Sequence, residues 1–219
     1  MKAPSIKGTI FCAVAVEIQE LRKQGRISED QLAVALEAAD IGLLEKQSLT
    51  ASWYPIPTYA RYLDLLCKTV GGGDPRYYEV RGHASARRLM DAGLYSQLDL
   101  LETITDGSQI EDPADQRAAL TTYRKKLAIV VSLAGSIYNV GQWKVIDDGE
   151  HAGRVTIEIR EAAAYSDGMA GAIVGFLDEC AHSVTGKIDK LYFFERPERD
   201  RLRIRMLMDL VDVRRARGR

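Results

Sequence analysis

Apolar side chains near the start of the chain recur every three or four residues, the spacing of one helix face. The positions that predict this first helix are Ile10, Phe11, Val14, Ile18 and Leu21. Gly25 is expected to end it, because glycine is the residue found most often just past a helix. Ser28 and Gln31 form a capping-box pattern, which predicts a second helix running through Leu32 and Leu36.

Prolines mark the starts of three further helices. The segment 53–57, Trp-Tyr-Pro-Ile-Pro, should be extended, because each proline disfavours helix in the residue before it, and a helix should follow. Asp74-Pro75 and Asp112-Pro113 each combine a capping aspartate with a proline in the first turn. They predict one helix ending near residue 93 and a long one running towards Gly141.

The period then changes from helical to alternating. Val155, Ile157 and Ile159 alternate with polar residues, which predicts a strand with one face in water. Asp148-Gly149 favours a turn between this strand and an earlier one over 143–146, so a hairpin is expected.

A buried helix over 169–182 and strands over 188–194 and 201–206 should follow. The predicted fold class is α+β: amino-terminal helices followed by a mixed or antiparallel β-β-α-β-β sheet. We expect a single domain over 1–219, with a helical part of about 7–141, a sheet part of about 142–212 and a basic tail at 213–219.

Composition narrows the classes of function. The chain has 219 residues, 46% of them hydrophobic and 28% charged, as in ordinary globular proteins. A formal charge of −1 offers no general attraction for nucleic acid or an anionic membrane. No apolar run approaches the ~18 residues of a membrane span, and the start lacks a signal-peptide pattern. We therefore expect a cytoplasmic protein.

Several motifs together resemble a known superfamily. Lys7-Gly8-Thr9-Ile10, the stretch 82–93 and the stretch from Arg154 to His182 are similar, in order and spacing, to haem-dependent nitric oxide/oxygen-binding domains. Trp53-Tyr54-Pro55 looks closer to an uncharacterised bacterial paralogous family expanded in myxobacteria. The resemblance places that family near the haem sensors, the vinyl-reductase-type ligand domains and the vesicle-tethering TRAPP subunits. It implies a haem-NO-binding-like fold.

The sequence departs from the haem sensors at the positions that hold the cofactor. There a tyrosine, a serine and an arginine at alternate positions bind the haem propionates; here the same register gives Tyr165, Asp167 and Met169. A carboxylate repels a propionate, and a thioether cannot replace a guanidinium donor. The axial histidine is also missing, because no histidine lies between Leu89 and Gln142. We expect no haem and no other cofactor.

The residues give no complete catalytic or metal-binding constellation. His83 has Arg87 rather than a second ligand four residues on, and His151 lies in the expected hairpin loop. Cys180 and His182 are two apart on a helix, where side chains diverge. The sequence therefore predicts no catalytic residue, no metal site and no enzyme.

Two sets of residues are candidates for interaction with a partner. Arg201, Arg203 and Arg205 share one strand face and could bind an anion or an acidic partner, or could pair with Glu158, Glu161 or Glu195 on neighbouring strands. The aromatic cluster Trp53, Tyr54, Tyr59 and Tyr62 could line a ligand or partner surface, or could be core residues with polar tips.

Two binding hypotheses follow. In the first, the protein is a haem-less regulatory or scaffolding module that acts through a partner protein or a homodimer. In the second, it is a sensor of an apolar or acyl small molecule, held between the helices and the sheet. In the second case we expect the pocket to be lined by Ile10, Val14, Leu66 and Tyr165.

Overall fold

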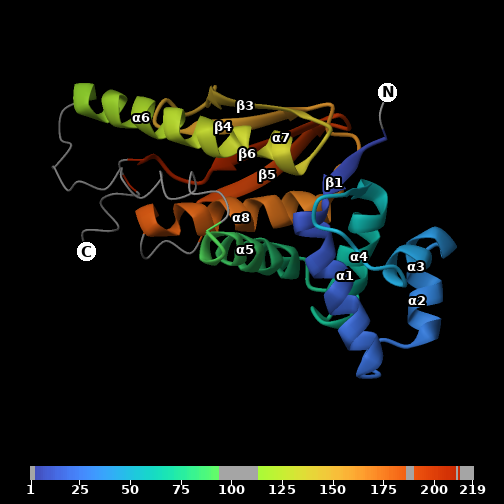
Figure 1. Cartoon of the computed structure of the whole chain (residues 1–219). Helices are drawn as coiled ribbons and strands as arrows, with labels where there is room; N and C mark the ends of the chain where they lie inside the picture. Colours follow the sequence, from blue (N-terminus) through green and yellow to red (C-terminus); the bar gives the residue numbers. More distant parts are fainter. Residues whose placement is uncertain (1–2, 94–112, 186–189, 211, 213–219) are drawn as a thin grey trace.

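The computed structural model describes residues 3–93, 113–185, 190–210 and 212 (Figure 1). In chain order the elements are β1 (Ser5–Lys7), α1 (Gly8–Lys23), α2 (Glu29–Ala35), α3 (Ala38–Leu44), β2 (Trp53–Pro55), α4 (Ile56–Thr69), α5 (Arg76–Asp91), α6 (Pro113–Ser132), α7 (Ala134–Ile137), β3 (Gln142–Asp147), β4 (Val155–Arg160), α8 (Asp167–Thr185), β5 (Tyr192–Glu198) and β6 (Arg201–Met206). The fold class is α+β, as the sequence predicts.

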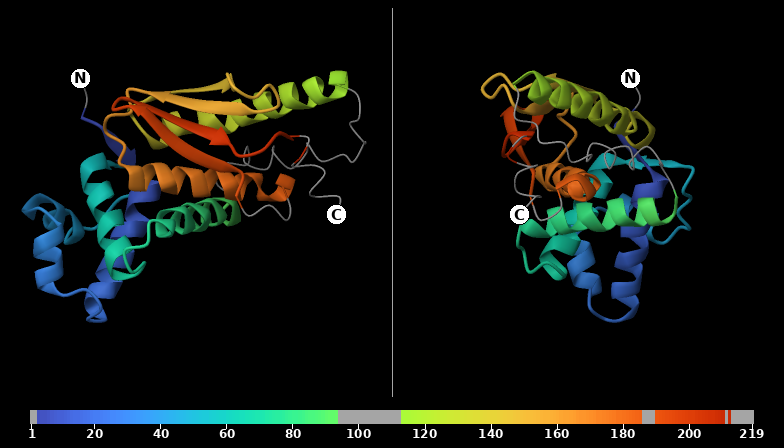
Figure 2. Two further views of the ribbon diagram at one scale, coloured as in Figure 1. Left: turned by 180° about the vertical axis from the view of Figure 1, so that it is seen from behind. Right: turned by 90° about the vertical axis from the view of Figure 1, so that its left-hand side faces the viewer.

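The larger sheet has four antiparallel strands in the order β3-β4-β6-β5. Helices α6 and α8 cover one of its faces, and α5 lies along α8 on the side away from the sheet (Figures 1 and 2). The helices α1 to α4 gather at one end of this layered part. There β1 pairs with β2, and Ile6 of β1 forms a bridge with Tyr138 just after α7. One cluster of buried side chains runs through both parts, from Ile6 to Leu210.

Local signals placed most helix starts and ends correctly. The capping box of Ser28 and Gln31 is present at the start of α2, and Gly25 after α1 has a positive φ of 70°. The Oδ1 atom of Asp74 accepts a hydrogen bond from the backbone nitrogen of Arg76 as α5 begins. The expected hairpin is the β3–β4 pair.

Other predictions need correction. Helix α3 and strand β1 were not expected, and the second helix ends at Ala35. The long helix does not continue to Gly141: it ends at Ser132, and α7 follows separately. Between them, the nitrogen of Leu133 donates to the carbonyl of Val130, an i−3 bond that tightens the turn and interrupts the α-helical pattern. The basic tail expected at 213–219 lies outside the described residues.

The prediction of a wet face for β4 is wrong. Thr156 and Glu158 are only 3% and 6% exposed. Strand β4 lies between β3 and β6, so longer polar side chains from neighbouring segments cover it. The hydroxyl of Thr156 donates to Asp148, and Arg160 donates to Glu158. An alternating pattern indicates which side chains share a face, but not whether that face is covered.

Glycines allow α5 and α8 to approach closely. A methyl group at Gly82 would collide with the carbonyl of Ala172 and lie 2.6 Å from the backbone nitrogen of Phe176. A methyl group at Gly175 would likewise collide with the carbonyl of Glu79. The two helices therefore pack backbone against backbone, which fixes the position of α5 beneath the sheet layer.

Among the described residues, no helix has the length and hydrophobicity needed to cross a membrane.

Candidate functional site

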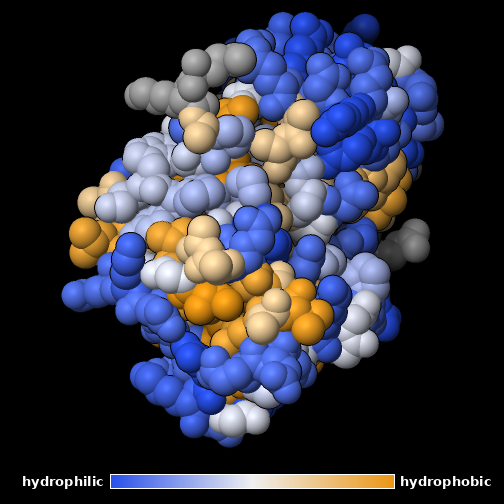
Figure 3. Space-filling view, turned by 90° about the vertical axis from the view of Figure 1, so that its right-hand side faces the viewer, coloured by the Kyte–Doolittle hydropathy of each residue, from blue (hydrophilic) through white to orange (hydrophobic). Residues whose placement is uncertain are grey.

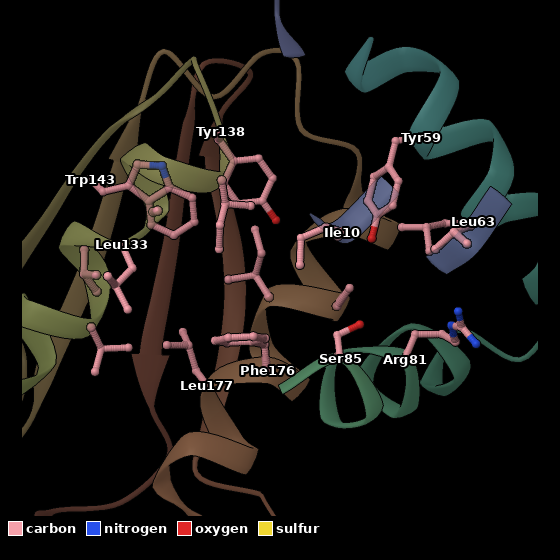
Figure 4. A pocket seen from close by; sticks show the side chains of 18 residues that line it. Ile10, Tyr59, Leu63, Arg81, Ser85, Leu133, Tyr138, Trp143, Phe176 and Leu177 are labelled. Atoms are coloured by element: carbon pink, nitrogen blue, oxygen red, sulfur yellow. The ribbon is translucent and has the colours of Figure 1, made fainter. Parts of the chain in front are cut away.

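A cavity lies where the helical end meets the sheet layer. Its volume is about 80 Å³, several times the ~10–15 Å³ that one water molecule needs. Helices α1, α4 and α5 form one side, α6 and α7 the other, and α8 the base (Figure 4). The lining residues are Ile10, Val14, Tyr59, Leu63, Arg81, Gly82, Ser85, Val130, Val131, Leu133, Ala134, Ile137, Tyr138, Trp143, Ala172, Ile173, Phe176 and Leu177.

The lining is mainly hydrocarbon. Of the side chains that line it, only Tyr59, Arg81, Ser85, Tyr138 and Trp143 carry a nitrogen or oxygen atom. Trp143 presents an aromatic ring, which stacks on that of Tyr138 with the ring centroids 5.8 Å apart. Such a cavity has the character of a small-molecule site, in which apolar walls provide most of the contact and a few polar groups fix orientation.

Two tyrosines on opposite sides direct their hydroxyl groups into the cavity (Figure 4). Tyr59 comes from α4, and Tyr138 follows α7. Burial raises the pKa of Tyr59 to about 12. It raises the pKa of Tyr138 well above the ordinary value, with a further contribution from the nearby Tyr59. Both groups are therefore neutral hydroxyls at physiological pH.

The charge at the edge of the cavity is already paired. An Nη atom of Arg81 lies 2.5 Å from a carboxylate oxygen of Glu17, and the guanidinium group points away from the two tyrosine hydroxyls (Figure 4). The hydroxyl of Ser85 accepts a hydrogen bond from Arg88 at 3.3 Å. The cavity consequently offers neutral polar groups but no unpaired charge.

Two of the four residues that were expected to line a pocket do line the cavity. Ile10 and Val14 line the cavity. Leu66 and Tyr165 do not: Leu66 is fully buried in the core on α4, and the hydroxyl of Tyr165 donates to the carbonyl of Val140 at 2.8 Å. Tyr165 lies behind the lining, because its ring packs against those of Tyr138 and Trp143 with centroids 5.3 Å and 5.9 Å apart.

The four residues of the aromatic cluster lie in different surroundings. Trp53 is 43% exposed, with the Nζ atom of Lys7 4.9 Å from its ring centroid. Tyr54 is buried and stacks on Phe11 with centroids 4.1 Å apart. The hydroxyl of Tyr62 donates to the carbonyl of Asp40 at 2.7 Å. Only Tyr59 of the cluster reaches the cavity.

The arginine stripe pairs with acidic side chains. Arg203 lies 3.8 Å from Glu158 and 3.6 Å from Glu195, and Arg201 lies 3.1 Å from Glu198. Arg205 contacts Asp148 at 2.9 Å, Glu150 at 2.7 Å and Glu195 at 3.5 Å. These arginines therefore form ion pairs with carboxylates of the sheet and of the loop after β3, although within the described part of the chain the Nε atom of Arg203 has no hydrogen-bond partner.

Of the two histidines whose side chains the structure describes, one pairs with a carboxylate and the other is exposed. The Nδ1 atom of His83 lies 2.9 Å from Glu179, which also binds Arg87. His151 is exposed, and Cys67 and Cys180 are buried; the side chain of His182 lies outside the described residues. In the described part of the chain, no three His, Cys, Asp or Glu side chains lie together in a way that could hold a metal ion.

Tyr138 was missed in the sequence. It falls within the long helix predicted to run towards Gly141, whereas in the structure it follows the end of α7 and forms a bridge with Ile6. No periodicity could have shown this, because the two residues come from segments far apart in the chain. The gap between α5 and α6 was likewise visible only after folding.

Comparison with known proteins adds no relative. None of the family models, curated proteins or solved structures with which the chain was compared matches it. The candidate site must therefore be interpreted from its own geometry.

Proposed function

We propose that the protein is a non-catalytic binding module that senses a small apolar molecule held in the cavity between its helices and its sheet. The observation that carries this proposal is the cavity itself: a space of about 80 Å³ with a mainly hydrocarbon lining and neutral polar groups. Binding there would couple α5, α6 and α8, three helices whose packing a ligand could stabilise. Such coupling would suit a regulatory protein.

We further propose that the scaffold is a haem-less relative of the haem-NO-binding domains. The order of elements, helices followed by β-β-α-β-β, supports this relationship. Asp167 pairs with Arg196 at 3.0 Å, and Met169 is only 1% exposed, so neither side chain is placed to hold a propionate in the cavity. An absorption spectrum of protein expressed with added haem tests this: we expect no Soret band, and a Soret band would return gas sensing to first place.

Mass spectrometry and thermal unfolding test the ligand hypothesis. We expect gently purified protein to carry a small bound mass, or to gain thermal stability with a compact hydrocarbon such as methylenecyclohexane. Ala134→Leu places extra atoms in the cavity and should abolish both signals. Ala118→Leu adds the same atoms to an exposed position of α6 and serves as the matched control. A protein with no bound mass and no response to the hydrocarbon would refute the proposal.

Assembly through a surface is a second candidate function, favoured by an exposed apolar region over α2 and α3 (Figure 3). Val34 there is 90% exposed, and Ile41 and Leu43 are half-buried beside it. We propose a second copy of the chain as the partner, because two copies of one apolar face can cover each other. Sedimentation should then show a dimer that Val34→Lys converts to monomer. A monomer at all concentrations would exclude this assembly.

A further inference from the structure

The tyrosines of this protein fall into two groups. Six buried or half-buried tyrosines have hydroxyl groups with a hydrogen-bond partner in the protein: Tyr54, Tyr62, Tyr78, Tyr123, Tyr165 and Tyr192. Half-buried Tyr77 lies beside Arg81, whose hydrogen bond to it opposes the burial that raises the pKa of Tyr77. For the two remaining described tyrosines, Tyr59 and Tyr138, the hydroxyls have no such partner in the part of the chain that the structure describes. Tyr59 is 95% buried, being only 5% exposed. Tyr138 is half-buried. Tyrosine hydroxyls inside a protein usually find a partner, so these two are available to a molecule in the cavity.

The two tyrosines whose hydroxyls have no partner among the described residues lie at the same place in the fold. Both side chains line the same cavity, and their hydroxyls approach it from opposite sides (Figure 4). Burial raises the pKa of Tyr138, and the nearby Tyr59 and Tyr165 raise it further. Two donors that converge on one region of an apolar space can share a single acceptor atom, and a carbonyl oxygen has the two lone pairs that this requires.

The charge around the cavity limits the ligand further. The only ionic group in the lining is Arg81, and Glu17 already neutralises it. A carboxylate or ammonium group on the ligand would lose its hydration without gaining an unpaired partner, which is strongly unfavourable. A neutral ligand suffers no such penalty.

We propose that the ligand of this site is an uncharged, mainly hydrocarbon molecule whose single carbonyl oxygen accepts hydrogen bonds from both Tyr59 and Tyr138. The inference rests on the proposed sensing function and specifies its ligand class. The hydrocarbon part of the ligand would contact residues such as Val130, Ile173 and Leu177. The tyrosines then provide specificity, because a molecule without the oxygen leaves both hydroxyls unpaired.

Four compact probes of similar size separate the alternatives: cyclohexanone, methylenecyclohexane, cyclohexanecarboxylate and cyclohexylammonium. The first two differ only in C=O against C=CH₂. We expect NMR titration of the full chain to give cyclohexanone an affinity about tenfold higher than that of methylenecyclohexane, and both ions to bind more weakly than either. The carbonyl stretch of bound cyclohexanone should also move to lower frequency in the infrared spectrum, as expected for an oxygen that accepts two hydrogen bonds.

Variants locate the effect. Tyr59→Phe and Tyr138→Phe should each reduce the preference for the ketone by about threefold while the affinity for the hydrocarbon stays the same. Tyr62→Phe is the matched control, because its hydroxyl binds the carbonyl of Asp40 rather than facing the cavity, and it should leave the preference unchanged. The control also shows whether a loss of stability alone could alter binding.

The binding of the four probes shows separately whether the carbonyl ligand or the apolar sensor itself is refuted. Equal binding of the ketone and the hydrocarbon would refute the carbonyl ligand but keep the apolar sensor. Tightest binding of cyclohexanecarboxylate would also refute it and would point to Arg81. Binding of none of the four probes would count against the sensor itself, with the cavity then holding water only.

Discussion

The polar groups on the outer face of the four-stranded sheet differ from two tyrosine hydroxyls at the cavity on its inner side. On the outer face, Arg203 and Arg205 each have carboxylate partners, and the carboxylate of Asp148 accepts hydrogen bonds from Arg205, Thr156 and two backbone nitrogens. On the inner side, Tyr59 and Tyr138 face a cavity with no partner among the described residues. Since buried polar groups are normally paired, the network around Asp148 on the outer face contributes to stability, whereas the two cavity hydroxyls are available to a partner that comes from outside.

The largest expected effect comes from breaking the outer network. Asp148→Asn removes the charge that faces Arg205, whose side chain is only 13% exposed. Removing one partner of a buried ion pair costs about 3–5 kcal/mol, and we expect a loss of about 3 kcal/mol because Glu150 remains near Arg205. Urea unfolding measures this loss of unfolding free energy. Arg201→Gln, at an exposed pair, should cost less than about 1 kcal/mol. If the two variants proved equal, the outer face would not depend on Asp148.

The next effect tests the close helix contact below the cavity. Gly82→Ala places a methyl group against the backbone of α8, where neither side can move easily. We expect a loss of about 2–3 kcal/mol in unfolding free energy. Gly42→Ala is the matched control, because nothing lies within 4 Å of its added methyl group in α3, and it should gain up to about 1 kcal/mol. A tolerated Gly82→Ala would mean that the α5–α8 packing can open.

A third effect contrasts two buried aspartates. Asp148 on the outer face has a pKa held far below its ordinary value by Arg205, backbone and Thr156 hydrogen bonds, against the cost of burial. Asp178 in α8 lies on the inner side, and burial raises its pKa to about 6 although it accepts hydrogen bonds from the nitrogens of Leu191 and Tyr192. The folded protein therefore binds the Asp178 proton more tightly than the unfolded chain does. This contribution to stability is complete below about pH 4 and is lost as the pH rises through about 6.

Asp178→Asn tests that sign. The amide oxygen can still accept from Leu191 and Tyr192, but there is no charge to bury. We expect the variant to lack a decline of ~2 kcal/mol that the natural chain shows between about pH 4 and pH 7, measured by urea unfolding across that range. The Asp148 contribution runs the other way, since it is lost only as the pH falls below about 4. A variant that kept the decline would show that another group causes it.

Local chemistry accounts for what the sequence predicted well. The Ser28–Gln31 capping box and the alternation over 155–160 each depend on neighbours within a few residues. Such signals survive whatever the rest of the chain does, so the α+β class and the order of elements followed from them. The resemblance to the haem sensors implied a pocket between helices and sheet, and of the four residues expected there Ile10 and Val14 line the cavity.

Contacts between distant segments account for what was missed. Helix α3 contains Asp40, a fully buried carboxylate that is acceptable only because Arg61 and Thr58 of α4 donate to it. Part of the cover over Glu158 comes from Arg203 of β6, and Tyr138, which lines the cavity with Tyr59, forms a bridge with Ile6. No pattern within a short window encodes such meetings. The candidate site was accordingly the part of the molecule least accessible from sequence.

The smallest expected effect separates a paired hydroxyl from an unpaired one without any ligand. Tyr62→Phe removes a hydrogen bond to the carbonyl of Asp40, and we expect a loss of about 1 kcal/mol in unfolding free energy. Tyr138→Phe removes a hydroxyl with no partner in the described residues, so its free energy of unfolding should change by less than about 0.5 kcal/mol. The measurement is urea unfolding of both variants beside the natural chain. A loss at Tyr138 as large as that at Tyr62 would show that its hydroxyl already has a structural partner, and the contrast between the two sides of the sheet would then disappear. A small loss at Tyr138 together with a weakened ketone preference would instead assign that hydroxyl to binding, because it would contribute to recognition and not to folding.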